Sequence, residues 1–578
     1  MILSELPDIY CLGLKSLGAC NYDLSNPSLS FFSVGQLVSV IALILTFSQI
    51  ARPIIKLRRS TRSISQWFLL IGVILAIFFV FTAAILRAWP SQIPVFGYPI
   101  FWEFLAGSLF VGAGLSMIYQ VSTETHLSKY NAEKYLDLSK SIIARGSIDD
   151  LRDYGDEIIK SISIAVMACQ KHQLRSIQAD NHNDSQKMKP TDFERICYTL
   201  LDLWSDKEFC NVLVVKCPDT AIEILKAIQN SHLYESGAYA LVQELINQAM
   251  SDQDSILHRE VNFSGLGRFK SFMTTAFSQT DFVCSRLRPL QAWSWHTETS
   301  ITAPHIRLYG EAIGICLRAS IDEQSLNAIY PAFYSALKEV NSIAQQAVWR
   351  ISQLSENQLS QSEYAKILSE CTEIHRKIVI TIAALPNNQQ PLLNEININP
   401  EIYNPINDRS IYCAVAENSY QFIERLAMCK GHDDGIRLYA MEVWDQIFSP
   451  SAPISNTLNA VRQRFLYYLR NKIDKNLDIN HWYYPMVSRI LISIWGIPNC
   501  TDEVKALPEG SSRDESSLYV YFYTLLKQNF FAIRSSNIKH ANDLLPEGVL
   551  YIDEPPSLQQ TWFRDKTTLF NLIVPNNT

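Results

Sequence analysis

Three long apolar windows dominate the first 120 residues of the chain. Residues 30–51 and 67–86 contain no ionisable side chain, and residues 100–119 contain only Glu103. Each window has about 20 residues, and a helix of that length, rising about 1.5 Å per residue, spans a hydrocarbon core of roughly 30 Å. The pattern predicts three transmembrane helices; the alternative is a very apolar helical hairpin buried in a large soluble protein.

After residue 121 the apolar positions recur with helical spacing almost throughout. Residues 327–354 place them every three or four residues, which defines one face of a long amphipathic helix. These positions are Ile329, Phe333, Leu337, Val340, Ala344, Val348, Ile351 and Leu354. Only VLYID, residues 549–553, has the composition of a strand. The predicted fold class is therefore all-α, with three N-terminal transmembrane helices followed by a large, mostly helical domain.

The same patterns divide the chain into four regions. We expect a short extracytoplasmic segment at 1–29, a three-helix transmembrane domain at 30–121, connecting helices at 122–174 and a helical sensor or assembly domain at 175–578. No proline, and no glycine before Gly146, interrupts the segment after the third window. The third span therefore either continues as a rod of roughly 40 residues or breaks near Ser122 before a second helix.

Positive charge is concentrated between the first two apolar windows. The five basic residues there are Arg52, Lys56, Arg58, Arg59 and Arg62, whereas residues 1–29 contain only Lys15 and residues 87–99 only Arg87. Under the positive-inside rule this loop is cytoplasmic, so the N-terminus lies outside and everything after about residue 121 lies inside. We expect a multi-pass protein of the bacterial inner membrane with most of its chain in the cytoplasm.

Cysteine usage is compatible with this division. Cys11 and Cys20 fall in the segment expected to be extracytoplasmic, where a disulfide between them would persist, and the other ten cysteines are scattered through the remainder. The two alternatives, a Cys11–Cys20 disulfide and two free thiols, stay open. No metal site and no cofactor is expected, because the local CxxH pairs are about 260 residues apart.

Arginine and aromatic side chains alternate in residues 285–310. This segment contains the candidate ligand-binding residues Arg286, Arg288, Trp293, Trp295, His296, His305 and Arg307. Arginine forks match phosphate oxygens and indole faces stack on bases, so the composition suits an anionic nucleotide or a short oligonucleotide. The alternative is a tryptophan-rich core with arginines at its rim.

A second, similar blend follows at residues 461–485. Its candidate residues are Arg462, Arg464, Arg470 and Lys472, which precede His481 and Trp482. The chain beyond residue 124 carries 43 basic and 52 acidic residues, unlike a broadly basic nucleic-acid binder. Any anionic ligand must therefore be recognised in a local pocket.

Small residues mark one side of the third apolar window. Ser108, Gly112 and Ser116 stand four residues apart, a spacing that lets two membrane helices approach closely. Their partner is either another span of this chain or the same span of a neighbouring subunit. Three spans enclose no aqueous lumen, so conduction would require a homo-oligomer in the lipid bilayer.

Three functional hypotheses follow. The phosphate loop, dinucleotide turn, GxSxG elbow and HExxH motifs are absent, which makes an enzyme the weakest of them. The first is an oligomeric membrane effector, a channel or membrane-disrupting protein gated by a cytoplasmic ligand; in architecture alone it resembles the membrane effectors of bacterial anti-phage defence. The second is a membrane-anchored helical scaffold that recruits cytosolic protein partners without conducting, and the third is a membrane-tethered enzyme with an unfamiliar site.

Overall fold

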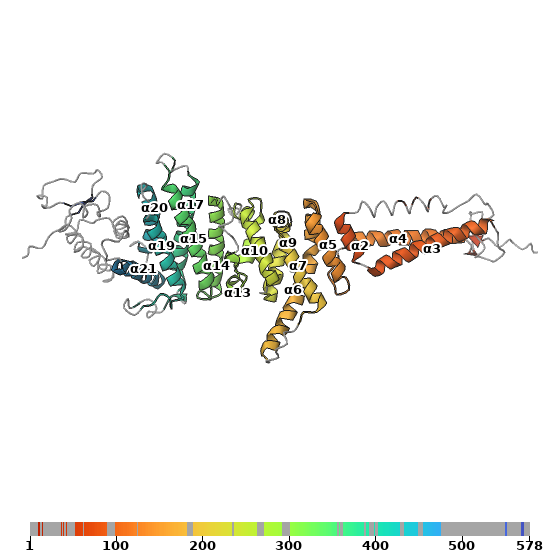
Figure 1. Ribbon diagram of the computed structural model, residues 1–578, viewed down its shortest axis with the longest axis horizontal. Helices are drawn as coiled ribbons and strands as arrows, with labels where there is room; N and C mark the ends of the chain where they lie inside the picture. The colour runs from red at the N-terminus through yellow and green to blue at the C-terminus, as the bar shows by residue number, and fades with distance from the viewer. Residues whose placement is uncertain are drawn as a thin grey trace, which may run out of the picture. The chain divides into compact units, whose positions relative to one another are not determined.

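The structure is a computed structural model, and it describes most of the chain between residues 52 and 475. The described residues are 10–11, 14–15, 36, 39, 42, 52–61, 63–88, 99–123, 125–181, 189–233, 236–262, 271–291, 301–354, 358, 362–386, 389–391, 398, 403–427, 433–448, 455–475, 549–551 and 568–570. They form two compact units, Met1–Gln248 and Ala249–Thr578. Both units are built from helices, which confirms the predicted all-α class (Figure 1).

Unit 1 contains two long apolar helices followed by a helical bundle. Its helices are α2 (Pro53–Ser60), α3 (Ser63–Ala88), α4 (Pro99–Ser122), α5 (Ala132–Arg145), α6 (Ile148–Asn181), α7 (Asp192–Trp204), α8 (Lys207–Lys216), α9 (Pro218–Ser231) and most of α10 (Ser236–Ser251). Helix α6 is the centre of the bundle, because α5, α7, α8 and α9 all pack against it. A short antiparallel ladder pairs β1 (Tyr10–Cys11) with β2 (Leu14–Lys15).

Unit 2 is a second helical assembly. Its helices are α11 (Ile256–Asn262), α12 (Ser271–Phe277), α13 (Thr280–Cys284), the 3-10 helix η2 (Pro289–Gln291), α14 (Ala303–Asp322), α15 (Tyr330–Ile351), α17 (Glu363–Ala383), α19 (Ile411–Ala427), α20 (Asp433–Phe448) and α21 (Asn456–Lys475). Helix α15 packs against α17 and α19, α14 packs against α17, and α20 and α21 pack against α19 (Figure 1).

Local sequence patterns account for several of these elements. The periodic apolar face predicted in residues 327–354 forms α15, with Phe333, Leu337, Val340 and Ala344 fully buried. The strand predicted at 549–553 is confirmed as β3 (Val549–Tyr551), which pairs in parallel with β4 (Thr568–Phe570).

Helix α4 ends at Ser122, so a continuous rod beyond the third apolar window is wrong and the alternative break is confirmed. The Thr123 hydroxyl donates to the carbonyl of Tyr119 at 2.7 Å, and the Ser122 hydroxyl donates to the same carbonyl at 3.3 Å. These short side chains satisfy a carbonyl of the last helical turn, and hydroxyls of this kind compete with helix continuation. Residues 125–131 are not helical, and α5 begins at Ala132.

A buried polar group joins the three central helices of unit 2. The Asn341 amide on α15 donates to the carbonyl of Asn418 on α19 at 3.0 Å, and its oxygen lies 3.0 Å from His375 Nε2 on α17. Because that oxygen can only accept, His375 donates from Nε2. Burial lowers the pKa of His375 to about 3, so this imidazole stays neutral in the folded protein.

This buried histidine predicts destabilisation in acid. The unfolded chain protonates His375 below about pH 6.5, whereas the folded chain resists protonation down to about pH 3, so stability falls as the pH is lowered through this window. Replacing His375→Gln keeps a donor for Asn341 but cannot titrate. Between pH 7 and pH 5 the unfolding free energy of wild type should fall by roughly 2 kcal/mol more than that of the variant. Thermal melting at both pH values measures this difference, and equal losses would contradict it.

Candidate functional site

Helices α3 and α4 form a hairpin whose outer surface is apolar. The hairpin core consists of Ala76 and Val80 from α3 and Ala106 and Phe110 from α4. Away from this core the large side chains are exposed, namely Leu70, Ile71, Ile74, Leu75, Phe78, Phe81 and Ile85 on α3 and Phe104, Val111, Leu115 and Ile118 on α4. Water disfavours an apolar surface of this size. Both helices are long and apolar enough to cross a membrane, at Leu70–Arg87 and Pro99–Tyr119.

The first predicted span, 30–51, lies outside the described residues except for Gln36, Ser39 and Ala42, which are helical. The second and third predicted spans correspond to α3 and α4. An ion pair closes the hairpin at the end far from α2, where Arg87 of α3 contacts Glu103 of α4. Glu103 is 1% exposed, so the only acidic side chain of this window is paired rather than isolated in an apolar environment.

Helix α2 contains most of the basic residues that were predicted to set the topology. Lys56, Arg58 and Arg59 lie in α2 and Arg52 immediately precedes it, while Arg62 lies outside the described residues. Figure 1 shows α2 lying across one end of the α3–α4 hairpin, between the hairpin and α5. The hydrophobic side chains of Ile54 and Leu57 are buried.

Glu157 of α6 binds both segments that enter and leave the hairpin. Its Oε2 accepts from Arg58 Nη2 at 2.5 Å and from Arg58 Nε at 3.0 Å. Its Oε1 accepts from the backbone N–H of Thr125 at 2.5 Å, three residues after α4 ends. One turn further along α6, the Ser161 hydroxyl accepts from the backbone N–H of Leu127 at 3.1 Å. We call Arg58, Thr125, Leu127, Glu157 and Ser161 the Glu157 junction.

Glu157 is 2% exposed. Buried aromatic side chains also bind α6 to its neighbours at Tyr154, one turn before Glu157. Trp204 Nε1 of α7 donates to the Tyr154 hydroxyl at 2.9 Å, and Tyr154 donates to the Ser139 hydroxyl of α5 at 2.7 Å. Burial raises the pKa of Tyr154 to about 12, although hydrogen bonds from its neighbours oppose part of that shift. The junction is therefore supported by a neutral, fully buried network across α5, α6 and α7.

Glu157 was not among the residues predicted from the sequence. The available signal was an acidic residue within the apolar face of α6, between Tyr154, Ile158 and Ser161, all of which are buried. A carboxylate in such a position requires a partner, because burying an unpaired charge is costly. Which cation is that partner could not be predicted, since Arg58 lies 99 residues away in the sequence.

The structure describes four of the seven residues of the first predicted ligand cluster, all in unit 2. Arg286 and Arg288 are exposed, and Trp293, Trp295 and His296 lie outside the described residues. His305 is buried and forms the capping box of α14 with Thr302, whose hydroxyl lies 2.8 Å from His305 Nδ1. Ligand binding by this cluster stays a prediction.

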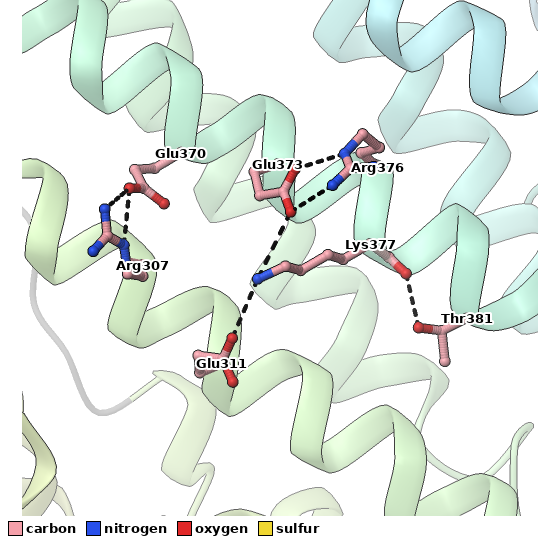
Figure 2. Close-up of polar contacts among 7 residues, drawn as sticks. All are labelled: Arg307, Glu311, Glu370, Glu373, Arg376, Lys377 and Thr381. Carbon is pink, nitrogen blue, oxygen red and sulfur yellow. Dashed lines mark hydrogen bonds and ion pairs between the residues drawn. The ribbon is translucent and has the colours of Figure 1, made fainter. Parts of the chain in front are cut away.

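Arg307, the last member of that cluster, belongs to a row of ion pairs between α14 and α17 (Figure 2). Arg307 Nε donates to Glu370 at 2.9 Å, and this bond and the charge of Glu370 raise the pKa of Arg307. Further along the same two helices, Lys377 lies 3.3 Å from Glu311 and 3.8 Å from Glu373. The Arg307–Glu370 and Glu311–Lys377 pairs join α14 to α17, whereas Glu373 and Lys377 both belong to α17. All are partly exposed, and each contributes at most about 1 kcal/mol.

Two members of the second predicted cluster, Arg462 and Arg464, are buried. Arg462 is 4% exposed and donates from Nε to the carbonyl of Ile447 at 2.5 Å. Arg464 is 5% exposed and donates from Nε to Asp408 at 2.6 Å. Arg470 and Lys472 belong to α21, but their side chains lie outside the described residues.

A cavity of about 590 Å³ adjoins Arg464 and Asp408. Its other lining residues are Gln324, Ser325, Leu326, Asn327, Ala328, Gln389, Gln390, Pro391, Ile398, Tyr403, Ser410 and Tyr412. This volume is within the usual range for small-molecule sites. We call it the Arg464 cavity; amides and hydroxyls supply most of its polar groups.

The two charged residues of the Arg464 cavity neutralise each other. Burial alone would raise the pKa of Asp408, but hydrogen bonds from Ser410 and Tyr403 and the charge of Arg464 outweigh it and hold that pKa below its usual range. The Tyr403 hydroxyl donates to Asp408 at 2.7 Å, and burial together with Cys413 and Asp408 raises the pKa of Tyr403. The described lining therefore suits a polar group without net charge better than a phosphate.

Two further predictions concern cysteines and metals. Cys11 lies in β1, opposite Leu14 of β2, while Cys20 lies outside the described residues, so the predicted disulfide stays a prediction. Among the residues that the structure describes, no group of three or more histidine, cysteine, aspartate or glutamate side chains is placed to bind a metal ion.

Two of the three small residues predicted to pack on α4 are exposed. Ser108 and Gly112 are exposed, and a Cβ atom added to Gly112 would meet no atom within 4 Å. Helix α3 instead contacts Ala106 and Phe110 on another side of α4. Ser116, the third small residue, is partly buried, so the helix that packs against this side of α4 stays a prediction.

Comparison of the chain with protein-family models, with curated proteins and with solved structures finds no match.

Removing the junction carboxylate should release the segment after α4. Replacing Glu157→Ala leaves the Thr125 N–H and the Arg58 guanidinium without this acceptor, at a cost of about 1–3 kcal/mol. Hydrogen exchange of the amides at 125–131 should become markedly faster. The matched control is Asp153→Ala, which removes the more exposed Arg52–Asp153 pair and should change stability by less than about 1 kcal/mol. Equal protection in the two variants would contradict the assigned role of Glu157.

Two substitutions on α4 should separate hairpin packing from packing with another helix. Replacing Ala106→Leu overfills the α3–α4 core and should destabilise the hairpin by about 1–3 kcal/mol. Replacing Gly112→Leu meets open space, so the hairpin should keep its stability while a detergent-solubilised oligomer loses mass. Thermal melting and light scattering measure the two effects. A Gly112→Leu variant with unchanged mass would exclude this side of α4 as the subunit interface.

Proposed function

We propose that this protein is an oligomeric membrane effector, in which a cytoplasmic helical region controls a hairpin inserted in the bilayer. The observation that carries the proposal is the Glu157 junction, through which α6 binds the segments at both feet of the hairpin. A rearrangement of the bundle around α6 would therefore reach the hairpin directly. This mechanism requires no long helical rod.

The contacts of α2 support a hairpin that crosses the membrane twice. Two crossings return the chain to the side on which it started, and α2 and the segment after α4 indeed meet at the same residue, Glu157. The basic residues Lys56, Arg58 and Arg59 assign that side to the cytoplasm under the positive-inside rule. With the predicted first span added, the N-terminus lies outside and the bulk of the chain lies inside, in a bacterial inner membrane.

Oligomerisation completes the proposed effector. A single hairpin encloses no aqueous lumen, so permeation requires several copies of the chain or disruption of the bilayer. Ser108 and Gly112 offer a close-packing side that is exposed. We propose that this side faces a second copy of the chain.

The Arg464 cavity is the proposed receptor for the gating ligand. Its size suits a small molecule, and its amides and hydroxyls suit the base or sugar of a nucleotide. The Asp408 carboxylate already neutralises Arg464, so the described lining gives no excess positive charge to phosphate groups. A ligand with a neutral, hydrogen-bonding portion fits this site better than the short oligonucleotide suggested by arginine content alone.

The arginines predicted to bind a ligand form bonds within the chain instead, and this favours a second candidate function. Arg307, Arg462 and Arg464 all bond within the chain, as expected of a helical scaffold that recruits cytosolic proteins without conducting. A scaffold would bind a partner in fixed stoichiometry and would leave liposomes sealed.

Dye leakage from liposomes tests the effector. The full chain, reconstituted in dye-loaded liposomes, should release dye when nucleosides or nucleotides are added on the side of the helical region. Asn327→Trp places a bulky ring at the cavity lining and should abolish the response, whereas Asp322→Trp, exposed nearby but outside the lining, should retain it. Glu157→Gln should bind the ligand and release little dye. A monomer that leaks under none of these additions would refute the proposal.

A further inference from the structure

A series of hydrogen-bonding groups leads from the Arg464 cavity into the interior of unit 2. Tyr403 and Asp408 line the cavity. The Tyr403 hydroxyl lies 2.7 Å from Asp408 Oδ2 and 3.4 Å from the sulfur of Cys413, a fully buried residue of α19. The hydroxyl of Tyr468 on α21 lies 3.3 Å from the same sulfur and donates to Glu417 Oε2 at 2.9 Å. We call this series the Cys413 chain: Asp408, Tyr403, Cys413, Tyr468 and Glu417.

The inner end of the Cys413 chain joins three helices. Glu417 belongs to α19, and its other oxygen, Oε1, accepts from the hydroxyl of Tyr334 on α15 at 2.9 Å. Tyr468, which donates to Oε2, belongs to α21. Helix α19 packs against both α15 and α21. A change in the bonds of Tyr468 therefore acts where these three helices meet.

The hydrogens of the Cys413 chain allow two arrangements. Burial raises the pKa of Tyr403, Cys413 and Tyr468, so each group keeps its single hydrogen at neutral pH. The hydrogen of Tyr403 goes either to Asp408, the nearer and charged acceptor, or to the sulfur of Cys413. In the second arrangement the sulfur accepts from Tyr403, so the thiol hydrogen is directed to Tyr468. The hydrogen of Tyr468 goes to Glu417 in both.

Asp408 decides between the two arrangements, because its acceptor positions are nearly filled. Its Oδ2 accepts from Arg464 Nε at 2.6 Å as well as from Tyr403, and its Oδ1 accepts from the backbone N–H of Ser410 at 3.0 Å. The Arg464 bond is charge-assisted and the Ser410 bond is fixed by the backbone, whereas a hydroxyl hydrogen can turn to another acceptor. A further donor at Asp408 therefore competes with Tyr403.

We infer that a ribose 2′ or 3′ hydroxyl of the ligand donates to Asp408 in the Arg464 cavity and turns the hydrogen of Tyr403 toward Cys413. This inference rests on the proposed function, in which this cavity receives the gating ligand. A neutral hydroxyl suits Asp408 better than an ammonium group, because Arg464 already balances the carboxylate charge. Carboxylates accept from ribose hydroxyls in dinucleotide-binding sites as well. Through Cys413 and Tyr468, occupancy of the cavity reaches the contact between α15, α19 and α21.

A thiol that only fills space in the core is the competing interpretation of Cys413. Cys371 of α17 is such a thiol, because it is fully buried and its sulfur lies 3.9 Å from the carbonyl of Val340. Cys413 differs in having two hydroxyls, from Tyr403 and Tyr468, within 3.4 Å of its sulfur. Cys371 therefore provides a matched control.

Isothermal titration calorimetry of the full chain in detergent measures the hydroxyl contact. The four ribonucleosides are compared with their 2′,3′-dideoxy counterparts. The ribonucleoside that binds should do so roughly tenfold to hundredfold more tightly than its dideoxy form, which lacks a hydrogen bond to a charged group. Tyr403→Phe removes the competing hydroxyl and should strengthen ribonucleoside binding several-fold, whereas loss of a purely structural contact would weaken it. Equal affinities, or weaker binding by Tyr403→Phe, would overturn the inference.

Dye release from liposomes measures transmission through Cys413. Cys413→Ala should bind the ribonucleoside with nearly the affinity of wild type but lose the dye response. Cys413→Ser, whose hydroxyl both donates and accepts, should keep the response. Cys371→Ala removes the matched buried thiol of α17 and should respond like wild type. Equal responses of Cys413→Ala and Cys371→Ala would overturn the role of the Cys413 chain.

Failure of the inference and failure of the proposed function give different results. Absence of binding by all four ribonucleosides would refute the proposed receptor together with this inference. Dye release that is equal for a ribonucleoside and its dideoxy form would support the effector and refute only the hydroxyl contact. Circular dichroism confirms that the variants fold.

Discussion

Unit 1 depends on one buried carboxylate. Glu157 is almost inaccessible to water, and a charge in that position is stable only when paired and hydrogen-bonded. Arg58 supplies the charge, and the backbone of Thr125 supplies a further donor. Three segments that are distant in the sequence are therefore held at one point. The positions of α2, of the segment after α4 and of α6 follow from this requirement.

Unit 2 satisfies its buried polar groups among neighbouring helices. Asn341 bonds to Asn418 and His375 across α15, α19 and α17, and Arg464 bonds to Asp408 beside the cavity. In both units the buried polar groups named here are hydrogen-bonded, but the structural consequence differs. In unit 2 this hydrogen bonding fixes helix packing and shapes a neutral polar cavity. In unit 1 it connects the bundle to an apolar hairpin.

Much of the fold could be predicted because it depends on local patterns. The second and third apolar windows predicted α3 and α4, and the three- and four-residue spacing of apolar positions predicted α15. The VLYID segment predicted β3. The end of α4 at Ser122 stayed open, because neither proline nor glycine marks it. It depends on hydroxyl groups bonding to Tyr119 and on Thr125 bonding to Glu157, and the second contact joins residues far apart in the sequence.

The candidate site was harder to predict than the fold. Arginine content suggested ligand contacts at Arg307 and Arg464, yet both bond to carboxylates of the same chain, 63 and 56 residues away. Composition identifies a residue that needs a partner but not which partner it finds. The same limit applied to Glu157, whose importance follows only from its position between α2 and the end of α4.

The break after α4 determines how the hairpin can move. Residues 125–131 are not helical, so no continuous helix couples α4 to α5. Both feet of the hairpin are tethered to neighbouring turns of α6, and Arg87 pairs with Glu103 at the far end. The two helices therefore cannot spread apart without breaking these bonds. In the proposed effector, a displacement of α6 would move the two helices together, and an opening in the bilayer would form between hairpins and not within one.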